Sequence, residues 1–299
     1  MQGLLRANVK QLLGSGHPAL DTIAKYYFQA EGKHIRPLIV LLMSQATNGM
    51  APGYASLLRE AEEREGQAEA AADGIDEPLT SPTILNDQNP DILSSAKSFL
   101  SSSLSGFTSR PTPSAHPLPS VSHLLPTQRR LAEITEMIHV ASLLHDDVID
   151  LAETRRSNPS APSLFGNKLT VLAGDFLLAR ASLALSRLGS NEVVELVASV
   201  LANLVEGEVM QMKGNTPDGG KLAGKLTPEI FEHYMKKTYL KTASLIAKST
   251  RATTILGGCG TRQGWAAGEP VKDVAYTYGR NIGIAFQVRC SSRQSTRGS

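Results

Sequence analysis

The chain lacks several features that would assign it to a class at once. It has two cysteines in 299 residues, which excludes a disulfide framework and favours a reducing compartment. Its formal net charge of +2 gives no electrostatic signal for nucleic acid or for a strongly acidic partner. The longest apolar run, Leu38–Met43, is far too short to span a bilayer. Nowhere do apolar and polar residues alternate for long enough to predict a sheet, and this agrees with an all-α fold.

The strongest helical pattern lies between Leu131 and Arg156, where apolar residues recur with the spacing of one buried helix face. A second face carries His139, Asp146 and Asp150, and Asp147 precedes Asp150 by three residues. Like charges at such spacings destabilise a helix, and carboxylates near its C-terminal end oppose the helix dipole. A divalent cation would offset both costs, because Mg²⁺ takes one or two carboxylates together with substrate phosphates.

Two arginines follow this acidic cluster directly, at Arg155 and Arg156. Paired guanidinium groups match the oxygens of a phosphate, so carboxylates, metal and arginines together predict a diphosphate site. The alternative is a solvated acidic helix end followed by a basic turn. The alignment of His139 with the carboxylates and the adjacent arginine pair favour the site.

The segment LLHDDVIDLAETRR, residues 143–156, resembles the first aspartate-rich motif of the trans-polyprenyl diphosphate synthases, and most of all the long-chain enzymes that make the ubiquinone tail. GKHIRP, residues 32–37, resembles that family's segment for isopentenyl diphosphate, and the pair Lys241-Thr242 resembles its contact to the allylic diphosphate. Without this context, Lys33 and Arg36 would be read as solvated residues before a core helix, and Lys241 as a solvated lysine.

The resemblance implies an all-α fold, an isoprenoid-synthase-like helical bundle around a central cavity, incomplete at the C-terminus. It implies a prenyltransferase that condenses isopentenyl diphosphate with an allylic diphosphate to give a long-chain polyprenyl diphosphate for ubiquinone biosynthesis, with several Mg²⁺ ions as cofactor. No side chain would act as a nucleophile. Positioning and charge neutralisation would carry the catalysis.

The resemblance also assigns residues to roles. The expected metal ligands are Asp146, Asp150 and Asp147. The expected isopentenyl diphosphate ligands are Lys33, Arg36, His139 and Arg156. The expected allylic diphosphate ligands are Arg155, Lys241, Thr242, Gln287 and, on a weaker signal shared with Glu208, Gln211. The small side chains of Ala141 and Ser142, one turn before Asp146, are expected to leave room for a long product.

Four regions are expected along the chain. Residues 1–52 form the first helices of the synthase domain, 53–126 an insertion without regular structure apart from a short helix within 60–69, 127–287 the central part of the domain, and 288–299 an aberrant disordered tail. Within the domain, we expect helix starts near Pro18, at Asn191 as an N-cap and at Thr227-Pro228, and a loop over 157–168.

The resemblance breaks near the end of the chain. The family continues with a second aspartate-rich cluster, whereas no carboxylate side chain follows Val288 here. A valine codon begins with GT, as introns do, so an unspliced intron is our leading hypothesis for this tail. Met1–Leu20 carries Arg6 and Lys10 and no acid, a charge pattern typical of transit peptides, but no Arg- and Ser-rich leader precedes it. Mitochondrial localisation, on the matrix side, is implied by the resemblance alone.

The implied partners are the two diphosphate substrates and a second subunit, in a homodimer or a heteromer. Peripheral membrane association is compatible with the sequence, and no nucleic acid is expected. Three alternatives stay open: a class I terpene cyclase, an inactive or regulatory subunit of a heteromeric synthase, and a scaffold protein. A terpene cyclase has no need of the Lys33 and Arg36 subsite, and incorporation of isopentenyl diphosphate would discriminate all three from the leading hypothesis.

Overall fold

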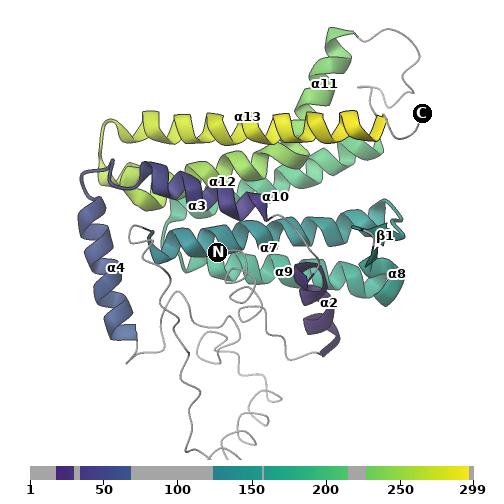
Figure 1. Ribbon diagram of the computed structural model, residues 1–299, viewed down its shortest axis with the longest axis horizontal. Coiled ribbons are helices and arrows are strands. Elements are labelled where there is room, and N and C mark those ends of the chain that lie inside the picture. Colours follow the sequence, from purple (N-terminus) through teal and green to yellow (C-terminus); the bar gives the residue numbers. More distant parts are fainter. Residues whose placement is uncertain (1–17, 30–33, 69–123, 157, 215–226, 296–299) are drawn as a thin grey trace, which may run out of the picture.

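Helix α7 (Pro126–Ile149) runs through the middle of a bundle of helices (Figure 1). The computed structural model describes residues 18–29, 34–68, 124–156, 158–214 and 227–295. Helices α3 (Ile35–Thr47), α9 (Asn167–Ser186) and α12 (Ser244–Thr254) pack against α7. Leu131, Ile134, Met137 and Leu144 on α7 are completely buried, as the apolar periodicity predicts. The all-α prediction is confirmed.

The other elements surround this core. They are α2 (Pro18–Gln29), α4 (Tyr54–Ala68), α8 (Ala161–Phe165), α10 (Asn191–Met212), α11 (Pro228–Thr238), the π-helical segments η1 (Tyr239–Ala243) and η2 (Ile255–Cys259), the 3₁₀ turn η3 (Thr261–Gln263) and α13 (Gly268–Ser295). Within the described residues, the only strand pairing is a short antiparallel hairpin of β1 (Thr154–Arg155) and β2 (Asn158–Pro159).

Local signals account for both ends of α7. Pro126 occupies the first turn, and the Gln128 side chain accepts a hydrogen bond from the backbone N–H of Leu125 at 3.1 Å. At the other end Asp150 is the C-cap, and Leu151 takes a left-handed conformation with φ 51°. Leu151 is 78% exposed, so it does not belong to the buried face that the periodicity assigned to it. The helix thus ends within the aspartate motif.

Helix α13 lies along one side of the bundle, against α12 and η1 (Figure 1). Two glycines at i and i+4 make this approach close enough. A Cβ at Gly283 would lie 2.6 Å from the Cα of Ala243, and one at Gly279 would lie 2.9 Å from the Cα of Ala247. This packing brings Gln287 beside η1.

Several predicted boundaries need correction. The N-cap of α10 is Ser190, whose hydroxyl accepts from Val193 N at 3.4 Å, and not Asn191; Thr227 caps α11 as predicted. Residues 158–165 carry β2 and α8 where a loop was expected.

The two segments expected to be disordered also differ from the prediction. Helix α4 occupies residues 54–68, where only a shorter helix was expected, and residues 69–123 of the predicted insertion lie outside the described part. Helix α13 continues to Ser295, so the prediction of disorder from Val288 is wrong up to that residue. Between Val288 and Gly298 the sequence contains no proline or glycine, and such a segment can extend a preceding helix despite its polar composition.

Among the described residues, α9 is the one helix whose length and composition would allow it to cross a membrane, and 39% of the relevant window is buried inside the bundle. Its buried residues, among them Ala173, Leu177 and Ala181, belong to the same core as α7. Because the core helix of a soluble protein can pass the same test, length and composition alone are weak evidence that α9 spans a membrane.

Candidate active site

The three aspartates at the end of α7 point to three different partners. Asp146 lies beside Lys241, with 3.5 Å between Oδ2 and Nζ. Asp150 is exposed and accepts a hydrogen bond from Gln211 Nε2 at 3.5 Å. Asp147 is fully buried and forms a bidentate ion pair with Arg155. The structure therefore separates Asp147 from the other two carboxylates.

Lys241 joins Asp146 to a second carboxylate. Its ammonium also donates to Glu208 Oε2, and Glu208 is only 8% exposed, with Oε1 lacking a hydrogen-bond partner in the described part of the chain. Burial raises the pKa of Asp146 to about 7; the Lys241 ammonium opposes this shift and the Glu208 carboxylate adds to it. This group has one more carboxylate than ammonium charge when all three residues are ionised.

The backbone carrying Lys241 is unusual. Lys241 and Thr242 lie on the π-helical segment η1, a wider helical turn that occurs frequently at functional sites. Gly207 on α10 makes room for it, since a Cβ there would lie 2.9 Å from Lys241 N. On the other side, Thr242 Oγ1 donates to Gln287 Oε1 at 3.1 Å. The close contact between α10 and η1 thus places Glu208 next to Lys241.

A group of cations lies on another side of the α7 end. Arg36 Nη1 and His139 Nε2 are 2.9 Å apart, and the buried pair of His34 Nδ1 and Glu136 Oε1 lies at 2.8 Å. Burial, and then the charges of Arg36 and Arg156, lower the pKa of His139 well below its usual range. His139 is therefore neutral, and its Nε2 accepts from the Arg36 guanidinium.

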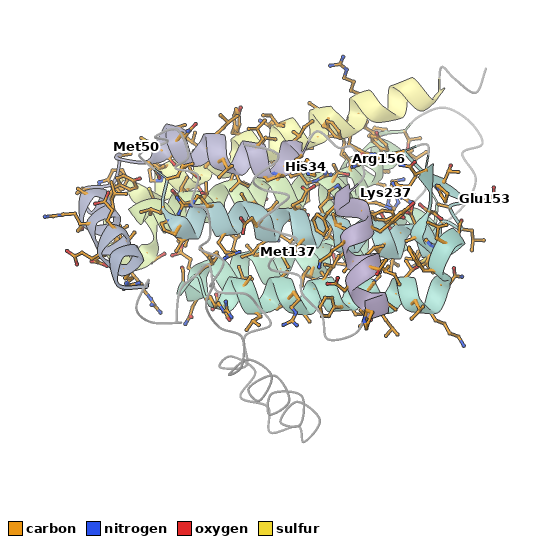
Figure 2. All side chains as sticks on the ribbon, turned by 60° about the horizontal axis from the view of Figure 1, so that its bottom comes forward. His34, Met50, Met137, Glu153, Arg156 and Lys237 are labelled. Carbon is orange, nitrogen blue, oxygen red and sulfur yellow. The ribbon has the colours of Figure 1, made fainter. Side chains whose placement is uncertain are left out.

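A cleft opens between these cations and α2. It is lined by Tyr27, Glu136, His139, Arg155 and Arg156, with two apolar residues of α7. Figure 2 shows His34, Lys237 and Arg156 toward the end of the bundle where α7 stops, with Met50 at the opposite end. Three non-glycine residues of the described part have left-handed backbones, and all three flank this region: His34, Leu151 and Arg156. Such strained conformations cluster at functional sites.

Asp147 and Arg155 form a separate anchor. Arg155 Nε donates to Asp147 Oδ2 at 3.1 Å and Nη2 donates to Oδ1. The phenol of Tyr27 on α2 also donates to Asp147 Oδ2. Burial raises the pKa of Tyr27, so its hydroxyl stays protonated and keeps donating. Arg155 therefore occupies both oxygens of Asp147, whereas Asp146 and Asp150 contact Lys241 and Gln211.

The predicted residues fall into groups accordingly. Asp146 and Asp150 lie with Lys241 and Gln211; Thr242 lies with Gln287; and Arg36, His139, Arg155 and Arg156 surround the cleft. Lys33 lies outside the described residues. Ala141 is completely buried in the core, and the Ser142 hydroxyl donates to His139 O of its own helix at 2.8 Å. His139 and Asp146 both lie within α7, seven residues apart, as the predicted alignment on one face requires, and Asp150 is the C-cap directly after the last residue of the helix.

Three contributors were not singled out from the sequence: Tyr27, His34 and Glu136. His34 lies within GKHIRP, and Glu136 lies three residues before His139 on α7, so helical spacing would have flagged Glu136 as a neighbour. Tyr27 lies in an apolar cluster of α2, and nothing in the local sequence distinguishes it from a core residue.

Comparison with known proteins identifies the family. The model of the polyprenyl synthetase family matches residues 114–289. The chain belongs to this family. A probable mitochondrial hexaprenyl pyrophosphate synthase of Neurospora crassa is 51% identical over 284 residues, covering 95% of this chain and 55% of the relative. The mitochondrial hexaprenyl pyrophosphate synthase of Saccharomyces cerevisiae is 40% identical, covering 95% of this chain and 65% of the relative.

Solved structures agree on the fold. A decaprenyl diphosphate synthase from Rhodobacter capsulatus superposes with a TM-score of 0.59 at 24% identity, covering 96% of this polyprenyl synthetase chain and 60% of that chain. A polyprenyl synthase from Caulobacter crescentus, complexed with calcium and isoprenyl diphosphate, gives a TM-score of 0.58 at 21% identity, covering 95% and 59%. The chain spans between 55% and 65% of the length of three curated relatives that it matches, the hexaprenyl pyrophosphate synthases of Neurospora crassa, Yarrowia lipolytica and Saccharomyces cerevisiae.

Proposed function

We propose that this chain is a trans-prenyltransferase that condenses isopentenyl diphosphate with an allylic diphosphate into a long-chain polyprenyl diphosphate. One observation carries the proposal: two charged subsites of opposite sign meet at the end of α7. On the acidic side, Asp146, Asp150 and Glu208 outnumber Lys241. A diphosphate would bind there only together with cations.

The other side is lined mainly by basic residues, and Glu136, which pairs with His34, lines it too. Arg36 and Arg156 adjoin the neutral His139, whereas the charge of Arg155 is matched by Asp147. A diphosphate would bind there directly, without a metal, through charge-assisted hydrogen bonds. A condensation of two diphosphate substrates requires two diphosphate subsites in one active site. A cyclase with a single substrate needs only the acidic subsite.

The acidic side fits Mg²⁺ as a site that the substrate completes. No three carboxylate, histidine or cysteine side chains gather into a preformed metal cluster within the described residues. Mg²⁺ binds through one or two carboxylates, several waters and substrate phosphates, and Asp146 and Asp150 supply that number. When bound, the metal neutralises the charge that develops on the leaving diphosphate. Asp147 is not among the proposed ligands, because Arg155 and Tyr27 occupy its oxygens.

The chain's own residues then orient the two substrates. Lys241, with Thr242 and Gln287 behind it, would bind the allylic diphosphate on the acidic side, and Gln211 would hold Asp150. Arg36, His139 and Arg156, with Lys33, would hold isopentenyl diphosphate so that its double bond faces the allylic carbon. Positioning of this kind, together with stabilisation of the leaving-group charge, is sufficient to explain the reaction without a nucleophilic side chain.

Product length, location and assembly follow from the relatives. Their names specify hexaprenyl and decaprenyl products, which agrees with the small Ala141 and Ser142 as part of a long pocket. Several are named as mitochondrial, which supports a mitochondrial location; ubiquinone biosynthesis there, on the matrix side, is part of the proposal. A 41% identical relative from Schizosaccharomyces pombe is named subunit 1 of a decaprenyl-diphosphate synthase, which supports a heteromer, with a regulatory subunit as the second candidate role.

A direct assay tests the proposal. The chain is incubated with radiolabelled isopentenyl diphosphate, farnesyl diphosphate and Mg²⁺, and labelled polyprenyl products are separated by chain length. We expect incorporation of label into long products. Absence of incorporation by the chain, alone and with a partner subunit, would refute the prenyltransferase proposal, and cyclised products without label would indicate a terpene cyclase instead.

Two substitutions test the division into subsites. Arg36→Ala is expected to raise the KM for isopentenyl diphosphate by about tenfold to a hundredfold, through loss of a charge-assisted hydrogen bond. Lys241→Ala is expected to raise the KM for the allylic substrate by a similar factor. Lys213→Ala, at an exposed position just beyond α10, is the matched control. If Arg36→Ala and Lys241→Ala changed both KM values equally, the two subsites would not be separate.

A further inference from the structure

The hydroxyl of Tyr27 occupies the junction of three separate segments. Tyr27 is 5% exposed and lines the cleft. Its hydroxyl donates to Asp147 Oδ2 at the end of α7 and accepts from Ala161 N, the first residue of α8, at 2.9 Å. These partners are 120 and 134 residues away in the sequence. A buried phenol with both hydrogen-bonding functions satisfied fixes the position of each group that it contacts.

Asp147 transmits this constraint to Arg155. The carboxylate is completely buried, and its oxygens accept from Nε and Nη2 of Arg155. This fork leaves Nη1 as the one terminal nitrogen of Arg155 that has no hydrogen-bond partner among the described residues. A bidentate pair fixes the plane of the guanidinium as well as its position. The orientation of Nη1 in the cleft therefore depends on the orientation of the Asp147 carboxylate.

The neighbouring Tyr26 makes a matched contrast on the same helix. Its hydroxyl donates at 2.9 Å to Pro159 O, at the exposed surface. Its ring packs edge-on against Phe165 with 5.6 Å between ring centroids. Tyr26 thus ties α2 to the same β2–α8 region as Tyr27, without contacting Asp147 or Arg155.

We propose that Tyr27 is a positioning residue: it holds the Asp147 carboxylate so that Arg155 presents Nη1 to a diphosphate in the cleft. This inference rests on the proposed function, because it takes a diphosphate as the ligand of that cleft. Removal of the phenol oxygen leaves Asp147 held by Arg155 alone, and the ion pair can then turn as a unit. The charge of Arg155 is preserved in that case, but its direction is lost.

The competing interpretation is that Tyr27 only ties α2 and α8 to the bundle. Tyr27→Phe would then lower stability without affecting diphosphate binding through Arg155. The two interpretations differ in whether the effect of Tyr27→Phe on diphosphate binding depends on Arg155. If Tyr27 positions Arg155, the substitution should not affect binding once Arg155 has been removed.

The experiment measures binding of inorganic diphosphate in the presence of Mg²⁺ to the full chain by calorimetry. The variants are Tyr27→Phe, Arg155→Ala and the double variant, with Tyr26→Phe as control, and thermal unfolding is recorded for each. We expect Tyr27→Phe to weaken diphosphate binding by about five- to tenfold, consistent with one lost buried hydrogen bond. Tyr26→Phe should leave binding within about twofold, as surface changes usually do. In the Arg155→Ala background, Tyr27→Phe should have no further effect on binding.

Equal weakening by Tyr27→Phe with and without Arg155 would overturn the inference, as would unchanged binding accompanied by a lower unfolding temperature. Asp147→Asn provides a second route if Tyr27→Phe does not fold, since it keeps the size of the side chain and weakens the grip on Arg155. It should weaken binding in the presence of Arg155 and not in its absence, and equal effects in the two backgrounds would again overturn the inference. A wild-type chain that binds no diphosphate would refute the proposed function itself, a result distinct from loss of the coupling alone.

Discussion

Asp146→Asn should make the unliganded protein more stable, although it removes a residue of the proposed active site. The Asp146 side chain is 19% exposed and lies near Glu208, and its pKa is raised from 3.8 to about 7, with burial as the largest cause and Lys241 acting against it. The charged form of Asp146 therefore has a higher free energy in the folded chain than in the unfolded chain, where water surrounds it. Asparagine keeps the shape of the protonated carboxyl group and cannot ionise.

The sign and size of the effect follow from proton linkage. Between about pH 4 and pH 7, the folded wild type holds a proton on Asp146 that the unfolded chain has released, so its stability falls as pH rises through this window. Above the pKa that Asp146 has in the folded chain, this loss of stability is complete and no longer changes with pH. With roughly 1.4 kcal/mol for each pKa unit, the stability of the variant should exceed that of the wild type by about 1–2 kcal/mol at pH 5 and about 4 kcal/mol at pH 8.

Urea unfolding at pH 5, 6, 7 and 8, with EDTA and without diphosphate, measures this difference. Asp150→Asn is the matched control: Asp150 is exposed at the C-cap of the same helix, so its variant should stay within about 0.5 kcal/mol of the wild type at every pH. The reasoning would be refuted if Asp146→Asn and the wild type had equal free energies of unfolding at pH 8, or if the difference between them became smaller as pH rises.

Three further substitutions probe other parts of the structure. Gly207→Ala places a Cβ 2.9 Å from Lys241 N and should cost about 1–3 kcal/mol of stability and lower prenyl transfer, whereas Gly53→Ala, where a Cβ meets only a side chain at 4.0 Å, should change neither. Ala141→Phe should shorten the product and, because Ala141 is completely buried, should also cost about 1–3 kcal/mol through overpacking. Lys272→Met should cost about 1–2 kcal/mol, since Lys272 is 1% exposed and pairs with two partly hydrated glutamates.

Urea unfolding measures the stability of each variant, and chain-length analysis of labelled products measures prenyl transfer and product length. A fully active Gly207→Ala variant would show that α10 does not position Lys241. An unchanged product distribution from a folded Ala141→Phe variant would contradict the pocket assignment. Stability of Lys272→Met equal to that of the wild type would show that the ion pairs of Lys272 with Glu192 and Glu269 contribute nothing to stability.

The sequence predicts most of the helices because their signals are local. The predicted N-cap of α10, Asn191, is one residue away from the observed N-cap, Ser190, and Thr227-Pro228 marks the start of α11. The extension of α13 to Ser295 was missed because a polar, Ser-rich composition was taken as disorder, whereas helix continuation requires only the absence of a breaker. The π-helical turn η1 was also missed, since its form depends on the contact with Gly207 and Gly283 and not on its own residues.

Most of the site residues predicted from the sequence lie around the end of α7 in the structure, but in groups that the spacing did not predict. Asp147 was predicted as a metal ligand beside Asp146, yet it follows Val140 and Leu144 at i+7 and i+3 and so lies on the buried face of α7. A carboxylate on that face requires a buried cation, and Arg155 eight residues later is that cation. The pairing with Tyr27 could not be predicted, because it joins helices 120 residues apart.

The partners of the three aspartates explain how the end of one helix tolerates them. The helix dipole and their mutual repulsion both disfavour carboxylates there, and each aspartate has a different compensation. Asp147 is paired with Arg155, and Asp146 shares one ammonium with Glu208. Among the described residues, Asp150 has only the amide of Gln211. The compensation is thus complete on the buried side and incomplete on the side facing the proposed substrate, where an incoming divalent cation would supply the missing charge. Retention of a destabilising Asp146 is then the expected cost of a site that becomes electrostatically balanced only when metal and diphosphate bind.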